Sequence, residues 1–145
     1  MSNLADFDVV VVGGGVAGSI TALLLARSNF SVLLVERANQ GASKAMSGGR
    51  LYAHCLQNIF PDFSERAPFE REIIEERLSI LSTDSGTTLS YRHPAFGDKQ
   101  TSFSVLRAKL DPWLMQEAEI AGVQLLAGAF VEKLHIEDNE VCGVC

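Results

Sequence analysis

A glycine-rich turn between two apolar segments carries the chemistry that is easiest to interpret in this sequence. The run Val9–Val12 is followed by Gly13, Gly15 and Gly18, and then by the helix-forming stretch Ser19–Arg27. In a G-x-G-x-x-G turn the first glycine permits positive φ, the second lets the backbone approach a pyrophosphate, and the third lets the helix pack closely on the strand. Unpaired amides at the start of the helix attract the anion. The predicted phosphate-binding residues are Gly13, Gly14, Gly15, Val16, Ala17 and Gly18.

An acidic residue after the next apolar run extends this pattern to a βαβ unit over residues 6–37. Ser31–Val35 leads into Glu36 and Arg37, about twenty residues beyond the turn, where a carboxylate accepts hydrogen bonds from ribose hydroxyls. Such a carboxylate repels a 2′-phosphate and disfavours NADP, although Arg37 weakens that objection. The residues alone leave FAD and NAD as alternatives. Glycines also mark ordinary turns, but the order of strand, helix, strand and acid favours dinucleotide binding.

Length and charge limit the class of protein. The chain has 145 residues, of which 47% are hydrophobic, and a formal net charge of −6, so we expect one soluble globular domain spanning residues 1–145. Nucleic acid is not expected as a partner because binding it requires clustered Lys and Arg. No apolar run is long enough to span a bilayer, and the N-terminus, with Asp6 and Asp8, lacks the features of a signal peptide. We therefore expect a cytoplasmic location.

The cysteines predict neither disulfides nor a metal site. There are three, an odd number that fits a reducing compartment. Cys142 and Cys145 form a C-x-x-C pair, but a single pair supplies only two of the four ligands that zinc or an iron–sulfur cluster requires. We expect no metal.

The segment 38–50 is rich in small residues and predicts a loop that lies over a ligand. Gly48 and Gly49 permit close backbone approach. Donors suited to phosphate or to a flavin carbonyl edge are Ser43, Lys44, Ser47 and Arg50. The alternative for this segment is a linker whose basic residues are merely solvated.

Periodicity and turn residues predict the elements up to residue 100. Apolar spacing indicates a helix over 51–60, and Asp84-Ser85-Gly86 between two alternating runs indicates a hairpin over 77–92. The charged run 70–77 is interpreted as a solvated face. His54 has no titratable partner nearby in sequence, so we assign no catalytic residue.

Beyond residue 100 a second set of elements follows. A strand is predicted over 102–106, and Asp111 with Pro112 predicts the start of a helix that stops at Gly122. Strands follow over 123–126 and 129–136, with Asp138-Asn139 as the next turn. The fold class is α/β, a Rossmann-like βαβ domain of the glutathione-reductase type with an inserted β-hairpin.

Taken together, these residues resemble the electron-transfer flavoprotein-quinone oxidoreductase family, in its FixC-type branch of FAD-dependent oxidoreductases. The resemblance covers nearly the whole chain. It rests on V-V-G-G-G-V-A-G-S at 11–19, V-E-R at 35–37, G-A-S-K-A-M-S-G-G-R-L-Y-A-H at 41–54, I-F-P-D-F at 59–63 and S-V-L-R-A-K-L-D-P-W-L-M at 104–115.

The resemblance implies FAD as the cofactor and adds residues to the site. It places Ser47, Gly48 and Gly49 near the ribityl and isoalloxazine parts, and this block disfavours an NAD-linked dehydrogenase. It brings Arg107 to the cofactor phosphates, and has the strand around Val131 offer backbone groups to adenine. The chain departs from the family pattern at Ala45, where a polar residue such as Asn is expected.

The same resemblance implies an electron-transfer flavoprotein and a ferredoxin-like protein as partners, and a quinone acceptor at a membrane surface. Members of this family run to about four hundred residues, a size that suits a multi-part enzyme. We therefore expect this chain to be the N-terminal portion, inactive alone, of a protein that in full-length form lies at the periphery of the inner membrane. The alternatives are a geranylgeranyl-reductase-like flavoprotein and a truncated, non-catalytic nucleotide-binding remnant.

Overall fold

The computed structural model describes residues 6–39, 47–93 and 102–145. The chain forms two compact units. The first unit comprises residues 1–47 and 107–145, and the inserted unit comprises residues 48–106. Among the described residues, no helix is long and apolar enough to cross a membrane.

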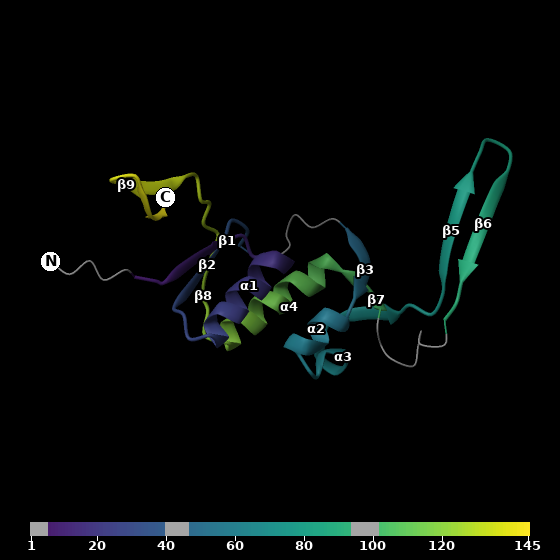
Figure 1. The fold of residues 1–145 in the computed structure, drawn as a ribbon, viewed down its shortest axis with the longest axis horizontal. Coiled ribbons are helices and arrows are strands. Elements are labelled where there is room, and N and C mark those ends of the chain that lie inside the picture. Colours follow the sequence, from purple (N-terminus) through teal and green to yellow (C-terminus); the bar gives the residue numbers. More distant parts are fainter. Residues whose placement is uncertain (1–5, 40–46, 94–101) are drawn as a thin grey trace. The chain divides into compact units, whose positions relative to one another are not determined.

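A parallel sheet forms the centre of the first unit (Figure 1). Its strands β1 (Val9–Val12), β2 (Val32–Glu36) and β8 (Gln124–Ala127) lie in the order β1-β2-β8. In register, Val9 pairs with Val32 and Leu33 with Gln124. Strands rich in Val and Leu are typical of a buried parallel sheet. The predicted α/β fold is confirmed, and the βαβ unit at residues 6–37 contributes its first two strands.

Two helices, α1 (Val16–Arg27) and α4 (Arg107–Ile120), pack against each other and against this sheet. Both helices carry fully buried small and branched residues, among them Ala22 and Leu23 in α1 and Leu114 and Ala118 in α4. Helix α1 connects the parallel strands β1 and β2, and α4 leads into β8, which is parallel to both. The N-terminus of α1 therefore lies at the carboxyl edge of the sheet.

The start of α4 differs from the prediction. The helix begins at Arg107, directly after a strand, and the amide of Arg107 donates to the carbonyl of Ser47 over 3.2 Å. Asp111 is therefore not an N-cap: it lies inside the helix and is 2% exposed. Pro112 also lies within the helix, where it cannot donate to the carbonyl of Ala108. The predicted stop is confirmed, because Gly122 has φ of +102° just after the helix.

A hairpin of β9 (Leu134–Glu137) and β10 (Glu140–Val144) follows β8 in the first unit. Asp138 and Asn139 both have positive φ, as a two-residue hairpin turn requires, and this confirms the predicted turn. The predicted strand over 129–136 is wrong in its first half, because β9 begins only at Leu134. Val131 lies in an irregular segment between β8 and β9.

The inserted unit contains an antiparallel sheet of β3 (Gly48–Tyr52), β7 (Ser102–Leu106) and β4 (Phe69–Glu72), in the order β3-β7-β4. Short helices α2 (His54–Ile59) and α3 (Phe63–Arg66) follow β3. The rings of Phe63, Phe69 and Phe103 cluster, with the Phe69 and Phe103 centroids 4.2 Å apart. The predicted helix over 51–60 is therefore too long, because residues 51 and 52 belong to β3. The last residues of the predicted 38–50 loop likewise lie in β3.

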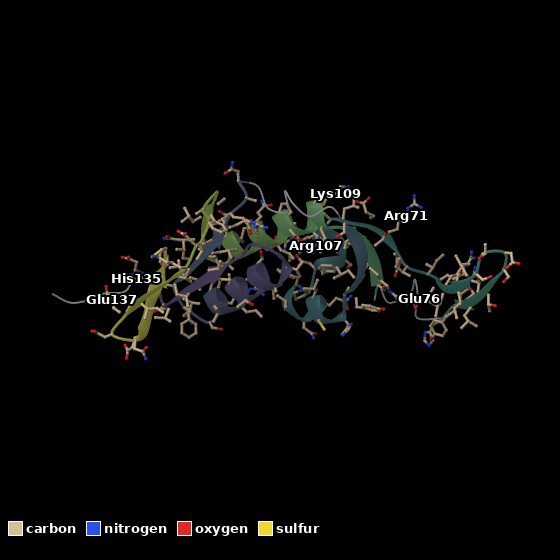
Figure 2. The ribbon with its side chains drawn as sticks, turned by 90° about the horizontal axis from the view of Figure 1, so that it is seen from above. Arg71, Glu76, Arg107, Lys109, His135 and Glu137 are labelled. Atoms are coloured by element: carbon tan, nitrogen blue, oxygen red, sulfur yellow. The ribbon has the colours of Figure 1, made fainter. Side chains whose placement is uncertain are left out.

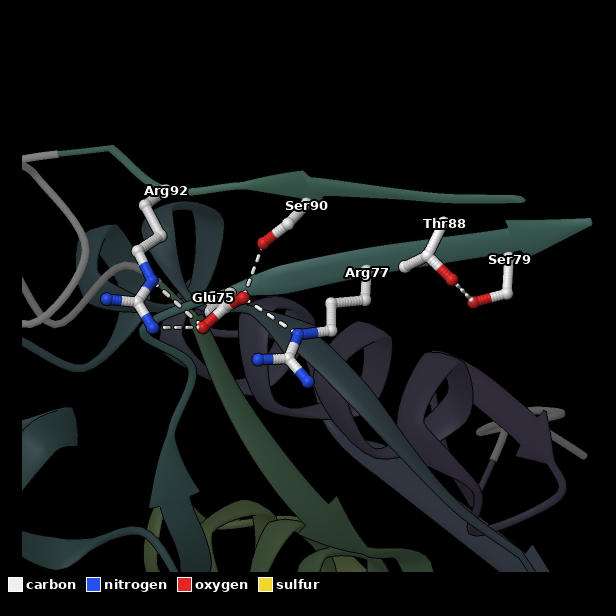
Figure 3. A network of polar contacts seen from close by, with 6 residues as sticks. All are labelled: Glu75, Arg77, Ser79, Thr88, Ser90 and Arg92. Atoms are coloured by element: carbon white, nitrogen blue, oxygen red, sulfur yellow. Dashed lines mark hydrogen bonds and ion pairs between the residues drawn. The ribbon is translucent and has the colours of Figure 1, made fainter. Parts of the chain in front are cut away.

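The predicted hairpin is confirmed as β5 (Glu76–Leu81) and β6 (Gly86–Tyr91), which pair with Leu78 opposite Leu89. A network at its base corrects the interpretation of 70–77 as only a solvated face (Figure 3). Glu75 accepts hydrogen bonds from Arg77 Nε at 2.8 Å, from the Ser90 hydroxyl, and from Arg92 Nε at 2.9 Å and Nη2 at 2.5 Å. These bonds, with that from Arg77 foremost, lower the pKa of Glu75 to about 2.

We expect the Glu75 carboxyl to titrate at about 2 in the folded protein, against an ordinary pKa of 4.5. The ionised network therefore stabilises the hairpin above pH 4.5, and this contribution is lost as the pH falls from 4.5 to about 2. Carbon-13 NMR of the side-chain carboxyl measures the midpoint. It should rise in Arg77→Gln, which lacks the first donor, and a wild-type midpoint near 4.5 would contradict the network.

Candidate dinucleotide-binding site

The carboxyl ends of the three parallel strands define the candidate site. Gly13 follows β1, Glu36 ends β2, and Gly128 follows β8. In open parallel α/β sheets, ligands bind at this edge. The residues of the predicted βαβ motif therefore meet in the first unit, as the spacing of the motif requires.

At two positions of the glycine turn, residues 13–18, the structure has the geometry that the sequence predicts. Gly13 has φ of +103°, and its amide donates to the carbonyl of Val35 over 2.7 Å. A Cβ on Gly18 would overlap the carbonyl oxygen of Gly13. Helix α1 thus starts directly against the end of β1, and only a residue without a side chain permits this approach.

Glu36 holds the glycine turn through the backbone. Its Oε2 accepts from the amide of Gly14 at 2.7 Å, and its Oε1 accepts from the amide of Ala38 at 2.9 Å. On the other side, the buried hydroxyl of Ser19 donates to the carbonyl of Gly14 over 3.2 Å. A carboxylate has about four acceptor positions, so about two remain for the hydroxyls of a ribose.

Ser19 was not predicted as a site residue. A small hydroxyl residue one position after the last glycine of the motif is the sequence signal that could have identified it. Its role here is to fix the turn, since both peptide groups that flank the Gly14 Cα are now hydrogen-bonded.

Gly15 leaves space where the anion is expected. It precedes α1 with φ of −77° and ψ of −175°, and no side chain of the described residues caps the helix there. A Cβ on Gly15 would lie 3.7 Å from the Nη2 atom of Arg107, and no other neighbour of it is found within 4 Å among the described residues. An uncapped helix N-terminus beside a guanidinium suits a phosphate group.

Arg107 therefore lies beside the glycine turn, as the family resemblance implies, at the first position of α4 (Figure 2). Its Nε and Nη2 donate to the two carboxylate oxygens of Asp111, each over 2.6 Å. The hydrogen bonds to Asp111 raise the pKa of Arg107 above its ordinary value, so the guanidinium is charged. The site thus combines two helix N-termini with one fixed cation.

The segment after β8 runs alongside the end of β2. The amide of Gly128 donates to the carbonyl of Ala38, and the amide of Ala129 donates to that of Glu36, each over 3.1 Å. These bonds bring the chain that leads to Val131 to the same edge as Glu36. The structure corrects only the local conformation at Val131, which is not a strand, while its contact with adenine stays a prediction. Arg37 is exposed next to Glu36.

The Ser47-Gly48-Gly49 block is divided between the two units. Ser47 belongs to the first unit and accepts from the amide of Arg107. Gly48 and Gly49 belong to the inserted unit, in β3, where a Cβ on Gly48 would lie 2.6 Å from the carbonyl oxygen of Val105. The need for glycine at position 48 thus comes from strand pairing. Ser43, Lys44 and Ala45 lie outside the described residues.

Other features of the described chain add no chemistry to the site. His54, Cys142 and Cys145 are exposed, and no cluster of three or more His, Cys, Asp or Glu residues with the geometry of a metal site occurs in these parts of the chain. A shallow groove of about 320 Å³ lies on the first unit between α4 and β8. It is lined by Asn39, Ala108, Pro112, Met115, Gln116, Glu119, Leu125 and Ala127.

The chain is similar to proteins of known family along most of its length. Residues 8–143 match the model of the FAD dependent oxidoreductase family. The chain is 47% identical to the probable electron transfer flavoprotein-quinone oxidoreductase YdiS of Escherichia coli (strain K12), over 95% of this chain and 32% of that protein. It is 46% identical to Protein FixC of the same strain, over the same shares. It thus spans about a third of the length of these curated relatives.

Among solved structures, the chain resembles a geranylgeranyl bacteriochlorophyll reductase-like protein from Thermoplasma acidophilum, with a TM-score of 0.78 and 24% identity. That match covers 95% of this chain and 34% of the other, and it supports the fold. Because the family model matches residues 8–143, this chain belongs to the FAD-dependent oxidoreductases.

Proposed function

We propose that this chain binds FAD at the carboxyl edge of the first unit. There it serves as the cofactor-binding portion of an oxidoreductase that moves electrons from an electron-transfer flavoprotein to a quinone or ferredoxin-like acceptor. The observation that carries the proposal is the convergence of Gly15, Glu36 and Arg107 at one edge of the sheet. In this arrangement, residues of one unit offer both an anion site and a ribose site.

The pyrophosphate of FAD would lie against the N-terminus of α1. The space beside Gly15 supports this position, because a side chain there would occupy the volume of the ligand. Amides of the first turn of α1 would hold the phosphate oxygens, and the charge of Arg107 would complement them. Val16 and Ala17, the first residues of α1, would contribute these amides.

The adenosine of FAD would extend from Glu36 toward the segment after β8. Glu36 has acceptor positions left after binding the amides of Gly14 and Ala38, which fits the two hydroxyls of a ribose. The segment that contains Val131 supports the adenine end, because Gly128 and Ala129 hold it against residues 36–38. Ser47, Gly48 and Gly49 are proposed to meet the ribityl and isoalloxazine parts, by family resemblance.

The bound flavin would supply the electron chemistry, and the protein would supply position and electrostatics. This division of roles fits a site in which we assign no pair of acid and base side chains among the described residues. The name of the relative YdiS, a probable electron transfer flavoprotein-quinone oxidoreductase, supports an electron-transfer flavoprotein as donor and a quinone as acceptor. With a quinone as acceptor, the full-length protein would lie at the surface of a membrane. A ferredoxin-like partner rests on the family resemblance alone.

Replacing Gly15 with Val should abolish FAD binding and leave the fold intact. The backbone at Gly15 is extended, with φ of −77°, so Val is sterically allowed, but its side chain fills the space beside Arg107. Titration of FAD by fluorescence quenching measures affinity, and circular dichroism measures folding.

Gly143→Val is the matched control, because it adds the same side chain at a β10 position where a Cβ would meet no atom of the described residues within 4 Å. The control should bind FAD as the wild type does. Equal FAD affinity in folded Gly15→Val would disprove the assignment of the turn.

Replacing Glu36 with Ala should weaken FAD binding by about 1–3 kcal/mol, the scale of charge-assisted hydrogen bonds. Binding of flavin mononucleotide, which lacks the adenosine, should not change. Isothermal titration with both ligands separates the two effects. Since Glu36 also holds the amides of Gly14 and Ala38, thermal melting is measured in parallel. Equal losses for both ligands would mean that Glu36 acts through stability alone.

A further inference from the structure

Arg107 and Asp111 form an ion pair with two short hydrogen bonds at the candidate site. Both oxygens of Asp111 are engaged by the guanidinium, at 2.6 Å each. The Asp111 side chain is 3% exposed, whereas that of Arg107 is 38% exposed. The carboxylate is therefore a buried anchor, and the cation it holds reaches the surface beside Gly15.

The order of these two charged residues along α4 does not stabilise the helix. Arg107 is the first residue of α4, where the helix dipole repels a cation, and Asp111 follows four residues later. A basic residue before an acidic one at this spacing is the less stabilising order. Burying a carboxylate also has a desolvation cost that a surface position would avoid. Helix stability alone therefore does not account for the arrangement.

A fixed guanidinium has a clear use at an anion site. A free arginine side chain loses much rotational freedom when it binds a ligand, and prior fixation removes that cost. Asp111 occupies two of the five N–H groups of Arg107 and leaves three. Its negative charge also offsets part of the attraction of Arg107 for an anion, so fixation and charge predict opposite effects when Asp111 is neutralised.

We propose that Asp111 is a positioning residue for the pyrophosphate of the cofactor: its carboxylate holds the guanidinium of Arg107 beside Gly15, ready for the anion. This inference rests on the proposed pyrophosphate site. It assigns a function to a residue that the sequence analysis interprets as a helix cap. Asp111 itself does not touch the ligand and acts only through Arg107.

The test compares binding of FAD, ADP and adenosine to the full chain. In Asp111→Asn, which keeps the size of the side chain and removes its charge, affinity for FAD and ADP should fall about tenfold. Adenosine, which has no phosphate, should bind as before. Glu117→Gln, a matched control at the other buried acid of α4, should leave all three affinities unchanged.

Two further variants separate positioning from folding. Arg107→Lys keeps the positive charge but cannot make the two parallel hydrogen bonds to Asp111. It should lower the affinity for ADP as Asp111→Asn does. In an Arg107→Ala background, adding Asp111→Asn should have no further effect on ADP affinity, because the residue through which Asp111 acts is gone.

Unchanged or tighter ADP binding in folded Asp111→Asn would overturn the proposal. An equal loss of affinity for adenosine would also overturn it, as would a further loss of ADP affinity when Asp111→Asn is added to Arg107→Ala. Wild-type protein that binds neither FAD nor ADP would instead reject the proposed function on which the inference rests. A wild type that binds both, with Asp111→Asn at wild-type affinity, rejects the positioning role alone.

Discussion

The hydrogen bond from the Gly14 amide to Glu36 is the contact on which the site depends. It joins the turn after β1 to the end of the neighbouring strand β2, at 2.7 Å. Because the same carboxylate binds the amide of Ala38, one side chain sets the path of the backbone on both sides of the expected ligand. The residue that we propose for the ribose is thus also a residue that holds the glycine turn in place.

Much of the first unit could be predicted because its signals are local. Glycine at positions 13 and 18 meets constraints that only glycine satisfies, and Val-rich runs indicate buried parallel strands. The errors occur where a local signal competes with tertiary structure. Asp111-Pro112 has the composition of a helix start, but β7 passes directly into α4 at Arg107, and Asp111 turns inward to an ionic partner. Residues 51 and 52 continue a helical pattern, yet pairing with β7 places them in β3.

The site residues likewise divide into those that local spacing predicts and those that depend on the tertiary structure. Gly13, Gly18 and Glu36 follow from spacing, because the motif itself fixes where they lie relative to the sheet. Arg107 is seventy-one residues beyond Glu36 in sequence, so only family resemblance indicated it, and only the fold brings it to Gly15. Ser19 and Asp111 were missed because each acts on another group, the Gly14 carbonyl or the Arg107 guanidinium. The position of Ser19 directly after the motif is a weak signal for its contact, whereas the sequence carries none for the contact of Asp111.

The inserted unit leaves and rejoins the chain at neighbouring points. Gly48 and Leu106 are opposite each other in the β3–β7 pair, and one residue beyond them Arg107 donates to Ser47. Since the two ends of the insertion are hydrogen-bonded neighbours, a connection between them needs only a tight turn, and the entropy of closing it depends weakly on how many residues lie between. The architecture is therefore modular: evolution or a protein engineer can exchange the segment between the two strands as a cassette, while β3 and β7 keep its anchor points together.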